Sequence, residues 1–71
     1  MHKLAGISQK DAVRVFQKLG YTVRRQGKHI AMAKGNADIL VIPQHTEIDA
    51  YTMGGIAKDA GLTPEEFRKF L

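Results

Sequence analysis

The histidine in the run Gly27-Lys28-His29 is the side chain of this sequence best suited to chemistry. The run separates two strand-like segments, and a glycine at its start can adopt the positive φ of a tight hairpin turn. Such a turn presents the side chains that follow it to solvent. Histidine gains and loses a proton near neutral pH, so His29 is a candidate for proton transfer on a bound substrate.

Cleavage of an RNA phosphodiester is a reaction that this arrangement suits. It requires a base for the ribose 2′-hydroxyl, a proton for the leaving oxygen and positive charge beside the phosphate. A positioned general base contributes on the order of 100-fold to 10,000-fold to such a reaction. We interpret His29 as that base or as the acid. The neighbouring cations Arg24, Arg25 and Lys28 are then expected to attract and neutralise phosphate. The alternative is an exposed turn histidine with no catalytic role.

Positive charge is concentrated in the first half of the chain. Residues 1–35 carry eight lysine and arginine side chains against Asp11 alone, a net charge of +7, whereas residues 36–71 have a net charge of −3. This distribution favours a nucleic acid or an acidic protein as the partner of the first half. We therefore add Lys10 to the residues expected to bind RNA. An ordinary solvated surface is the alternative.

A second histidine, His45, is an auxiliary candidate for the acid role that one histidine leaves unfilled. The alternative is a loop residue that helps to seat the end of a strand. His2, His29 and His45 lack the spacing of metal ligands, and no carboxylate–histidine cluster accompanies them, so we expect no metal site. The sequence also has no phosphate-binding glycine loop, and we expect no cofactor.

Length and composition limit the class of protein. A chain of 71 residues is expected to form one small domain over residues 1–71, with a thin core and no deep cavity. Without cysteine there is no disulfide framework or thiolate metal site, which favours a cytoplasmic location. The segment Met1–Ile7 has no long apolar stretch, so we expect neither a signal peptide nor a membrane span.

Periodicity predicts helices on both sides of the strand-like region. Ser8 is expected to begin a helix over about Gln9 to Leu19, with apolar residues at i, i+3, i+4 and i+7 on one face. A second helix, with the same apolar spacing, is expected to include Met53 to Ala60. Thr63 is expected to begin a short last helix through a capping box.

The strand-like runs 21–26 and 29–34 alternate between apolar and polar residues and predict a hairpin. If Gly27-Lys28 forms a two-residue turn, Gln26 lies opposite His29. Val23 then lies opposite Met32 on the core face. The same register predicts that Arg24, Gln26 and His29 share the open face.

A third strand completes the sheet. It is expected over residues 39–42, after a turn at Gly35-Asn36, and to be buried on both faces or nearly so until Pro43 ends it. The resulting fold is α+β, with a three-stranded antiparallel sheet that can leave one face open. Its α-β-β-β-α order, which precedes a short C-terminal helix, matches that of double-stranded-RNA-binding domains as a topological analogy.

Five segments together resemble the HicA family of bacterial and archaeal toxins, the ribonuclease halves of HicA–HicB toxin–antitoxin pairs. Their order and spacing carry the resemblance, since each segment is short. The segments are Leu4–Asp11, Leu19–Tyr21, Arg25–His29, Val41–His45 and Ala60–Phe67.

The resemblance implies a double-stranded-RNA-binding-domain-like fold and mRNA cleavage centred on the turn histidine, here His29. It also implies inhibition by a HicB-type antitoxin that covers the basic face. Two features depart from the family pattern. Lys28 stands in the middle of the turn, where serine is common, and Ile48–Gly54 retains Thr52 but lacks the usual basic residues.

Two other functions remain open. One is a non-catalytic RNA-binding module, which the missing basic residues near Thr52 favour and which would show salt-sensitive binding without cleavage products. The other is a small interaction protein whose basic face meets only an acidic protein.

Overall fold

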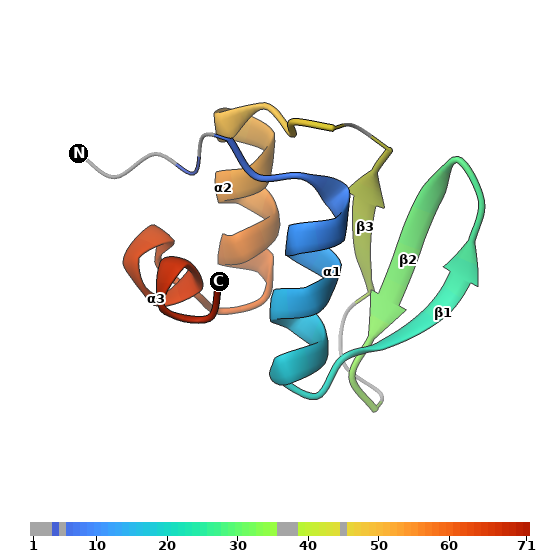
Figure 1. Ribbon diagram of the computed structural model, residues 1–71. Helices are drawn as coiled ribbons and strands as arrows, with labels where there is room; N and C mark the ends of the chain where they lie inside the picture. Colours follow the sequence, from blue (N-terminus) through green and yellow to red (C-terminus); the bar gives the residue numbers. More distant parts are fainter. Residues whose placement is uncertain (1–3, 5, 36–38, 45) are drawn as a thin grey trace.

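The structure, a computed structural model, describes residues 4, 6–35, 39–44 and 46–71 (Figure 1). Its elements are α1 (Gln9–Lys18), β1 (Thr22–Gln26), β2 (His29–Ala33), β3 (Leu40–Pro43), α2 (Ala50–Asp59) and α3 (Pro64–Lys69). The strands form one antiparallel sheet in the order β1-β2-β3. The predicted α+β arrangement is therefore confirmed.

Local hydrogen bonds fix both ends of α1. The Ser8 hydroxyl accepts the backbone N–H of Asp11 at 3.1 Å, which satisfies one of the free donors of the first turn. At the other end Gly20 has φ +98°, and the N–H of Tyr21 donates to the carbonyl of Phe16 at 2.9 Å. This pattern closes a helix and requires a residue that tolerates positive φ. Both ends agree with the sequence prediction.

The short helix α3 is held by its predicted capping box and by one aromatic anchor. The Thr63 hydroxyl accepts the Glu66 N–H at 3.1 Å, and the Glu66 carboxylate accepts the Thr63 N–H at 2.9 Å. Phe67 is fully buried and meets Phe16 edge to face, with ring centroids 5.6 Å apart. A helix of one and a half turns thus depends on tertiary packing for its stability.

The core lies between the sheet and the helices, which all occupy one side of the sheet (Figure 1). Its largest fully buried side chains are Phe16, Phe67, Leu4, Met32, Leu40, Ile42, Ile48, Met53 and Val15. On β3, Leu40 and Ile42 are 2% and 0% exposed, whereas Val41 between them is 53% exposed. The prediction that this strand is buried on both faces is wrong, because the described helices cover only one.

The β1–β2 hairpin has a different register from the predicted one. Val23 pairs with Met32, as predicted, but Val23 is 38% exposed and, unlike Met32, is not buried in the core. A bulge between Val23 and Arg25 shifts the pairing that follows. Gln26 therefore lies opposite Ile30 instead of His29. The predicted positive φ at the first turn residue is also wrong, because the positive-φ glycines are at positions 6, 20, 35 and 61.

The bulge decides which face each side chain of the hairpin occupies. An extra residue in one strand reverses the alternation beyond it. Gln26 consequently shares the helix-covered face with its partner Ile30, and Arg25 shares the open face with its partner Ala31. The prediction that Gln26 accompanies His29 on the open face is therefore wrong, and Arg25 takes that place.

The second predicted turn, Gly35-Asn36, is described only in part. Gly35 has φ +59°, and Asn36 lies outside the described residues.

In the described part of the chain, none of the helices is long and apolar enough to cross a membrane.

Candidate functional site

A hollow of about 360 Å³ lies on the open face of the sheet, beside the turn between β1 and β2. We call it the open-face hollow. Its lining residues are Arg25, Gly27, Lys28, His29, Ala31 and Val41. It opens to solvent, since the three ionisable side chains among them are all exposed. The hollow is thus accessible to a large substrate.

The backbone of His29 is fixed while its side chain stays available. His29 is the first residue of β2 and pairs with Pro43 of β3. Its carbonyl accepts the N–H of Gly27 at 3.2 Å, and the next residue, Ile30, is buried at 7% exposure. No other described residue hydrogen-bonds the His29 ring. Both ring nitrogens can therefore reach a substrate in the open-face hollow.

Charge in the open-face hollow is of one sign. The cations Arg25 and Lys28 line it, and no carboxylate of the described residues does. This positive charge favours a phosphate in the space that His29 also lines. Across the described residues, no group of three or more His, Asp or Glu side chains is placed to hold a metal ion.

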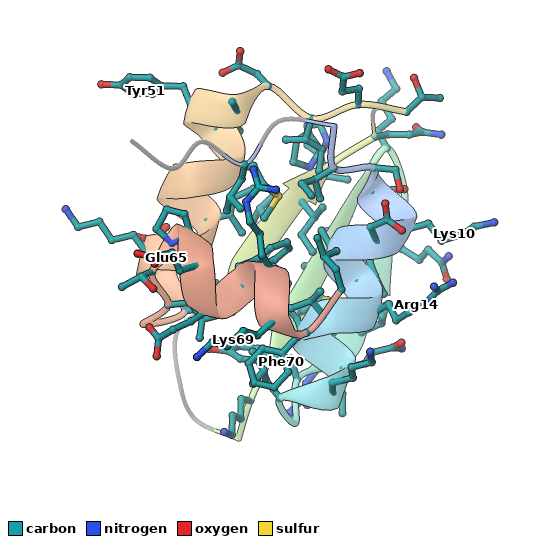
Figure 2. The ribbon with its side chains drawn as sticks, turned by 60° about the vertical axis from the view of Figure 1, so that its left-hand side comes forward. Lys10, Arg14, Tyr51, Glu65, Lys69 and Phe70 are labelled. Carbon is teal, nitrogen blue, oxygen red and sulfur yellow. The ribbon has the colours of Figure 1, made fainter. Side chains whose placement is uncertain are left out.

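The structure brings together three of the six predicted site residues. His29, Arg25 and Lys28 line the open-face hollow. Arg24 stands at the bulge and is absent from that lining. Lys10 lies on α1, on the other side of the sheet, where it projects to solvent (Figure 2). The auxiliary candidate His45 lies outside the described residues.

The apolar part of the open-face hollow was missed by the sequence prediction. Ala31 and Val41 are cross-strand partners and form its floor. The general rule that a meander covered on one face leaves every second residue of a strand exposed could have indicated it. The apolar run 39–42 masked this signal, since such a run is also typical of a strand buried on both faces.

The side chains that line the open-face hollow are suited to binding a phosphate and to transferring one proton. The cations neutralise phosphate oxygens, the His29 ring accepts or donates a proton, and the apolar floor offers contact area to a base or to a protein side chain. The described lining contains one histidine, so only one group suited to proton transfer near neutral pH is in place.

A family model described as the HicA toxin of bacterial toxin–antitoxin systems matches residues 10–62. The match covers most of the chain, from the first turn of α1 through the hairpin and β3 to the end of α2. The chain belongs to the HicA toxin family. The resemblance noted in the sequence is thereby confirmed.

Membership of the HicA family makes the chain a toxin of a toxin–antitoxin system, so an antitoxin is its partner. The turn with His29 and all residues of the open-face hollow lie inside the matched range, whereas α3 lies beyond it. Neither a curated protein nor a solved structure matches the chain.

Proposed function

We propose that this HicA-family toxin is a metal-independent endoribonuclease that cleaves mRNA, with His29 as general acid or base. The observation that carries the proposal is that the exposed His29 side chain lines the open-face hollow together with two cations, Arg25 and Lys28. Family membership supports it, because a toxin must act on a component of the cell that growth requires.

The chemistry needs little from the protein besides charge and proton transfer. A base removes the proton of the ribose 2′-hydroxyl, and that oxygen attacks the adjacent phosphorus. The bond to the 5′-oxygen breaks, and this oxygen leaves with a proton. The products are a 2′,3′-cyclic phosphate and a 5′-hydroxyl. Because the nucleophile belongs to the RNA, no metal-activated water is required.

In this proposal Arg25 and Lys28 stabilise the negative charge that builds on the phosphate. Arginine and lysine form charge-assisted hydrogen bonds with phosphate oxygens. These bonds strengthen as charge develops, so they favour the transition state over the bound substrate. His29 performs one of the two proton transfers.

The second candidate is an RNA-binding protein without catalysis. The observation in its favour is the single histidine in the described lining of the open-face hollow, which leaves one of the two proton transfers without an assigned group. This candidate shares the RNA affinity of the first and differs only in the absence of cleavage products.

We also propose that the antitoxin is of the HicB type and that it covers the open-face hollow. Val41 is 53% exposed on the hollow's floor, which is the kind of apolar contact that a protein interface covers. The cations around it favour an acidic segment on the partner. Such a partner would exclude RNA by occupying the same surface.

The test is RNA degradation by the purified chain, freed of antitoxin, in the presence of a chelator. We expect products with cyclic phosphate ends, and a matched substrate with 2′-deoxy sugars should resist. His29→Ala should lower the rate by about 100-fold to 10,000-fold. Lys58→Ala, which removes an exposed cation from the last turn of α2, is the control and should cleave at the original rate.

Circular dichroism of each variant checks that the fold is retained. Cleavage undiminished by His29→Ala, or equal cleavage of the deoxy substrate, would contradict the proposal. RNA binding without any product from the unmodified chain would favour the second candidate.

A further inference from the structure

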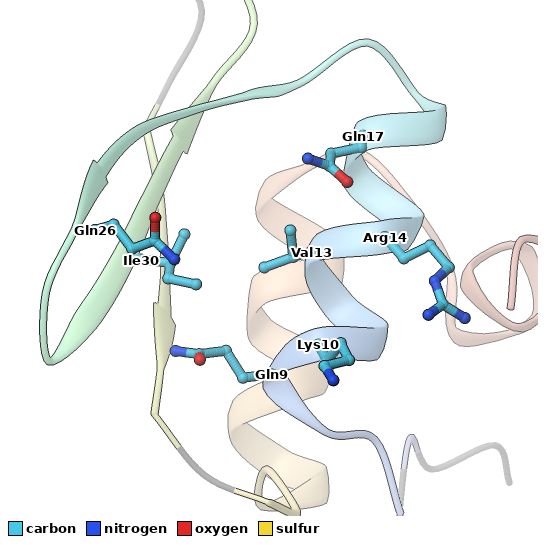
Figure 3. A pocket seen from close by; sticks show the side chains of 7 residues that line it. All are labelled: Gln9, Lys10, Val13, Arg14, Gln17, Gln26 and Ile30. Carbon is cyan, nitrogen blue, oxygen red and sulfur yellow. The ribbon is translucent and has the colours of Figure 1, made fainter.

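A second hollow, of about 370 Å³, lies between α1 and the β1–β2 hairpin (Figure 3). We call it the helix-side hollow. It faces the covered side of the sheet, whereas the open-face hollow with His29 faces the other. Gln26 and Ile30 line it, and these paired residues flank residues 27–29 at the tip of the hairpin, which include His29. The two hollows therefore adjoin the same turn from opposite faces.

Three glutamine side chains line the helix-side hollow: Gln9 and Gln17 from α1, and Gln26 from β1. Figure 3 shows Gln9 and Gln17 on the side of α1 that faces the hairpin, with Gln26 opposite them on β1. Gln9 donates through Nε2 to the Ile42 carbonyl at 3.3 Å, which orients its amide. Gln17 and Gln26 are exposed. Each amide offers donors and an acceptor, the pattern that pairs with the edge of a nucleobase.

The floor of the helix-side hollow is apolar and its rim is cationic. Val13 and Ile30 point toward each other across it (Figure 3) and can support the flat face of a ring. Lys10 and Arg14, one helical turn apart on α1, border the hollow, with the Arg14 guanidinium directed away from the hairpin (Figure 3), and no carboxylate of the described residues lines it. Neutral amides, an apolar floor and a cationic rim match a nucleobase with its neighbouring phosphates.

We propose that the helix-side hollow binds one unpaired base of an RNA strand. This inference rests on the proposed function, in which RNA is the substrate. It goes further by assigning the class of RNA, which is single-stranded. A paired base has its edge occupied and its faces stacked, so only a single-stranded region can present a base to the three amides. The strand then passes around the turn between the two hollows, which places a phosphate beside His29.

The test measures binding of a single-stranded oligonucleotide with 2′-O-methyl sugars, which cannot be cleaved through the 2′-hydroxyl. Fluorescence anisotropy gives its Kd, and the measurement is repeated with one abasic nucleotide at each position in turn. An abasic nucleotide keeps the phosphate and removes only the base. We expect one position at which this change weakens binding by about 10-fold, the size of a base contact.

The variant that locates this base is Gln17→Met with Gln26→Met. Methionine retains the length and apolar body of glutamine and removes its hydrogen bonds, and at position 17 on α1 the two residue types have similar helix propensity. We call the loss of affinity caused by the abasic nucleotide the abasic penalty. In this double variant the abasic penalty should disappear, while the intact oligonucleotide binds about 10-fold more weakly. Gln44→Met is the matched control, since Gln44 is exposed outside the hollow, and it should keep the penalty.

A penalty that survives in the double variant, or the absence of a penalty at every position, would overturn the inference. Equal affinity for a fully paired duplex would do so as well. The result is independent of catalysis, because the oligonucleotide is not cleaved. The inference can therefore fail while His29-dependent cleavage is intact. It can also hold, with a glutamine-dependent penalty, in a chain that cleaves nothing. The two results are distinguishable.

Discussion

His29 pairs with Pro43, the last residue of β3, across the β2–β3 ladder, so the first residue of β2 is fixed against the end of an edge strand. Ile30 and Ile42, the neighbours of this pair on the core side, pair with each other and are buried. The core therefore sets the position of the His29 backbone, although the ring itself is exposed. The His29 ring can therefore be exposed to a substrate while the strand that carries it stays fixed.

Arg25 is expected to contribute to RNA binding through charge. It lines the open-face hollow beside His29, so Arg25→Ala should remove one phosphate contact. Such a change weakens binding of all sequences alike and lowers the slope of log Kd against log salt concentration by about 1. A titration of RNA at several salt concentrations measures this slope. An unchanged slope would show that Arg25 does not contact phosphate, and Lys58→Ala is the control for the loss of one cation.

Gly27 is expected to tolerate a side chain, whereas Gly20 is not. Gly27 does not have a positive φ, and a Cβ built there meets nothing within 4 Å. Gly20 has φ +98°, and its Cβ would lie 3.3 Å from Cε of Lys34. We expect Gly20→Ala to lower the free energy of unfolding by about 1–2 kcal/mol. Gly27→Ala should leave it equal or raise it by up to about 1 kcal/mol, because alanine restricts the unfolded chain.

Urea unfolding of the two glycine variants measures this difference. A larger loss of stability in Gly27→Ala than in Gly20→Ala would contradict the observed turn conformation. If Gly27→Ala keeps its stability and loses RNA cleavage, the bare backbone at this position serves the approach of RNA.

Phe67 is expected to contribute strongly to the stability of α3 and of the core. It is fully buried and stacks edge to face on Phe16, so Phe67→Ala leaves a large cavity. Such a substitution costs about 3–5 kcal/mol, a large part of the stability of a small domain. Thermal unfolding measures the loss, and Phe67→Leu should recover part of it. Leu71→Ala is the control, because Leu71 is half exposed and its removal should cost less than about 0.5 kcal/mol.

Glu66 makes the stability of α3 depend on pH. The pKa of its carboxyl is lowered from 4.5, first by the hydrogen bond to the Thr63 backbone, then by the one to the Thr63 side chain and by the charge of Lys69. The folded chain thus binds this proton less readily than the unfolded chain. The stabilisation is present above pH 4.5 and is lost as the pH falls through the lowered pKa.

The measurement is the thermal midpoint from neutral to acidic pH for the unmodified chain and for Glu66→Gln. Glutamine can complete the capping box but carries no titratable group. The difference in midpoint between the two proteins should shrink on acidification. A difference that stays constant across the acidic range would show that the Glu66 charge does not contribute.

Much of the fold can be predicted from the sequence because its signals are local. The helix ends depend on residues three or four apart, such as Ser8 with Asp11 and Thr63 with Glu66, and the structure contains these contacts. The apolar spacing of each helix likewise reports its buried face. His29 was identifiable for the same reason, since its residue type and its place in a turn between strands are visible in a few neighbouring residues.

The composition of the site depended on contacts between distant segments. The bulge after Val23 moved Gln26 to the helix side and Arg25 to the side of His29, and a one-residue shift reverses every face beyond it. Val41 is exposed because the helices cover only one face of the sheet, a fact that no local pattern contains. The sequence by itself determined the helix ends, the order of elements and the histidine of the turn. Strand register and coverage of the sheet, which only tertiary packing decides, determined which side chains accompany that histidine.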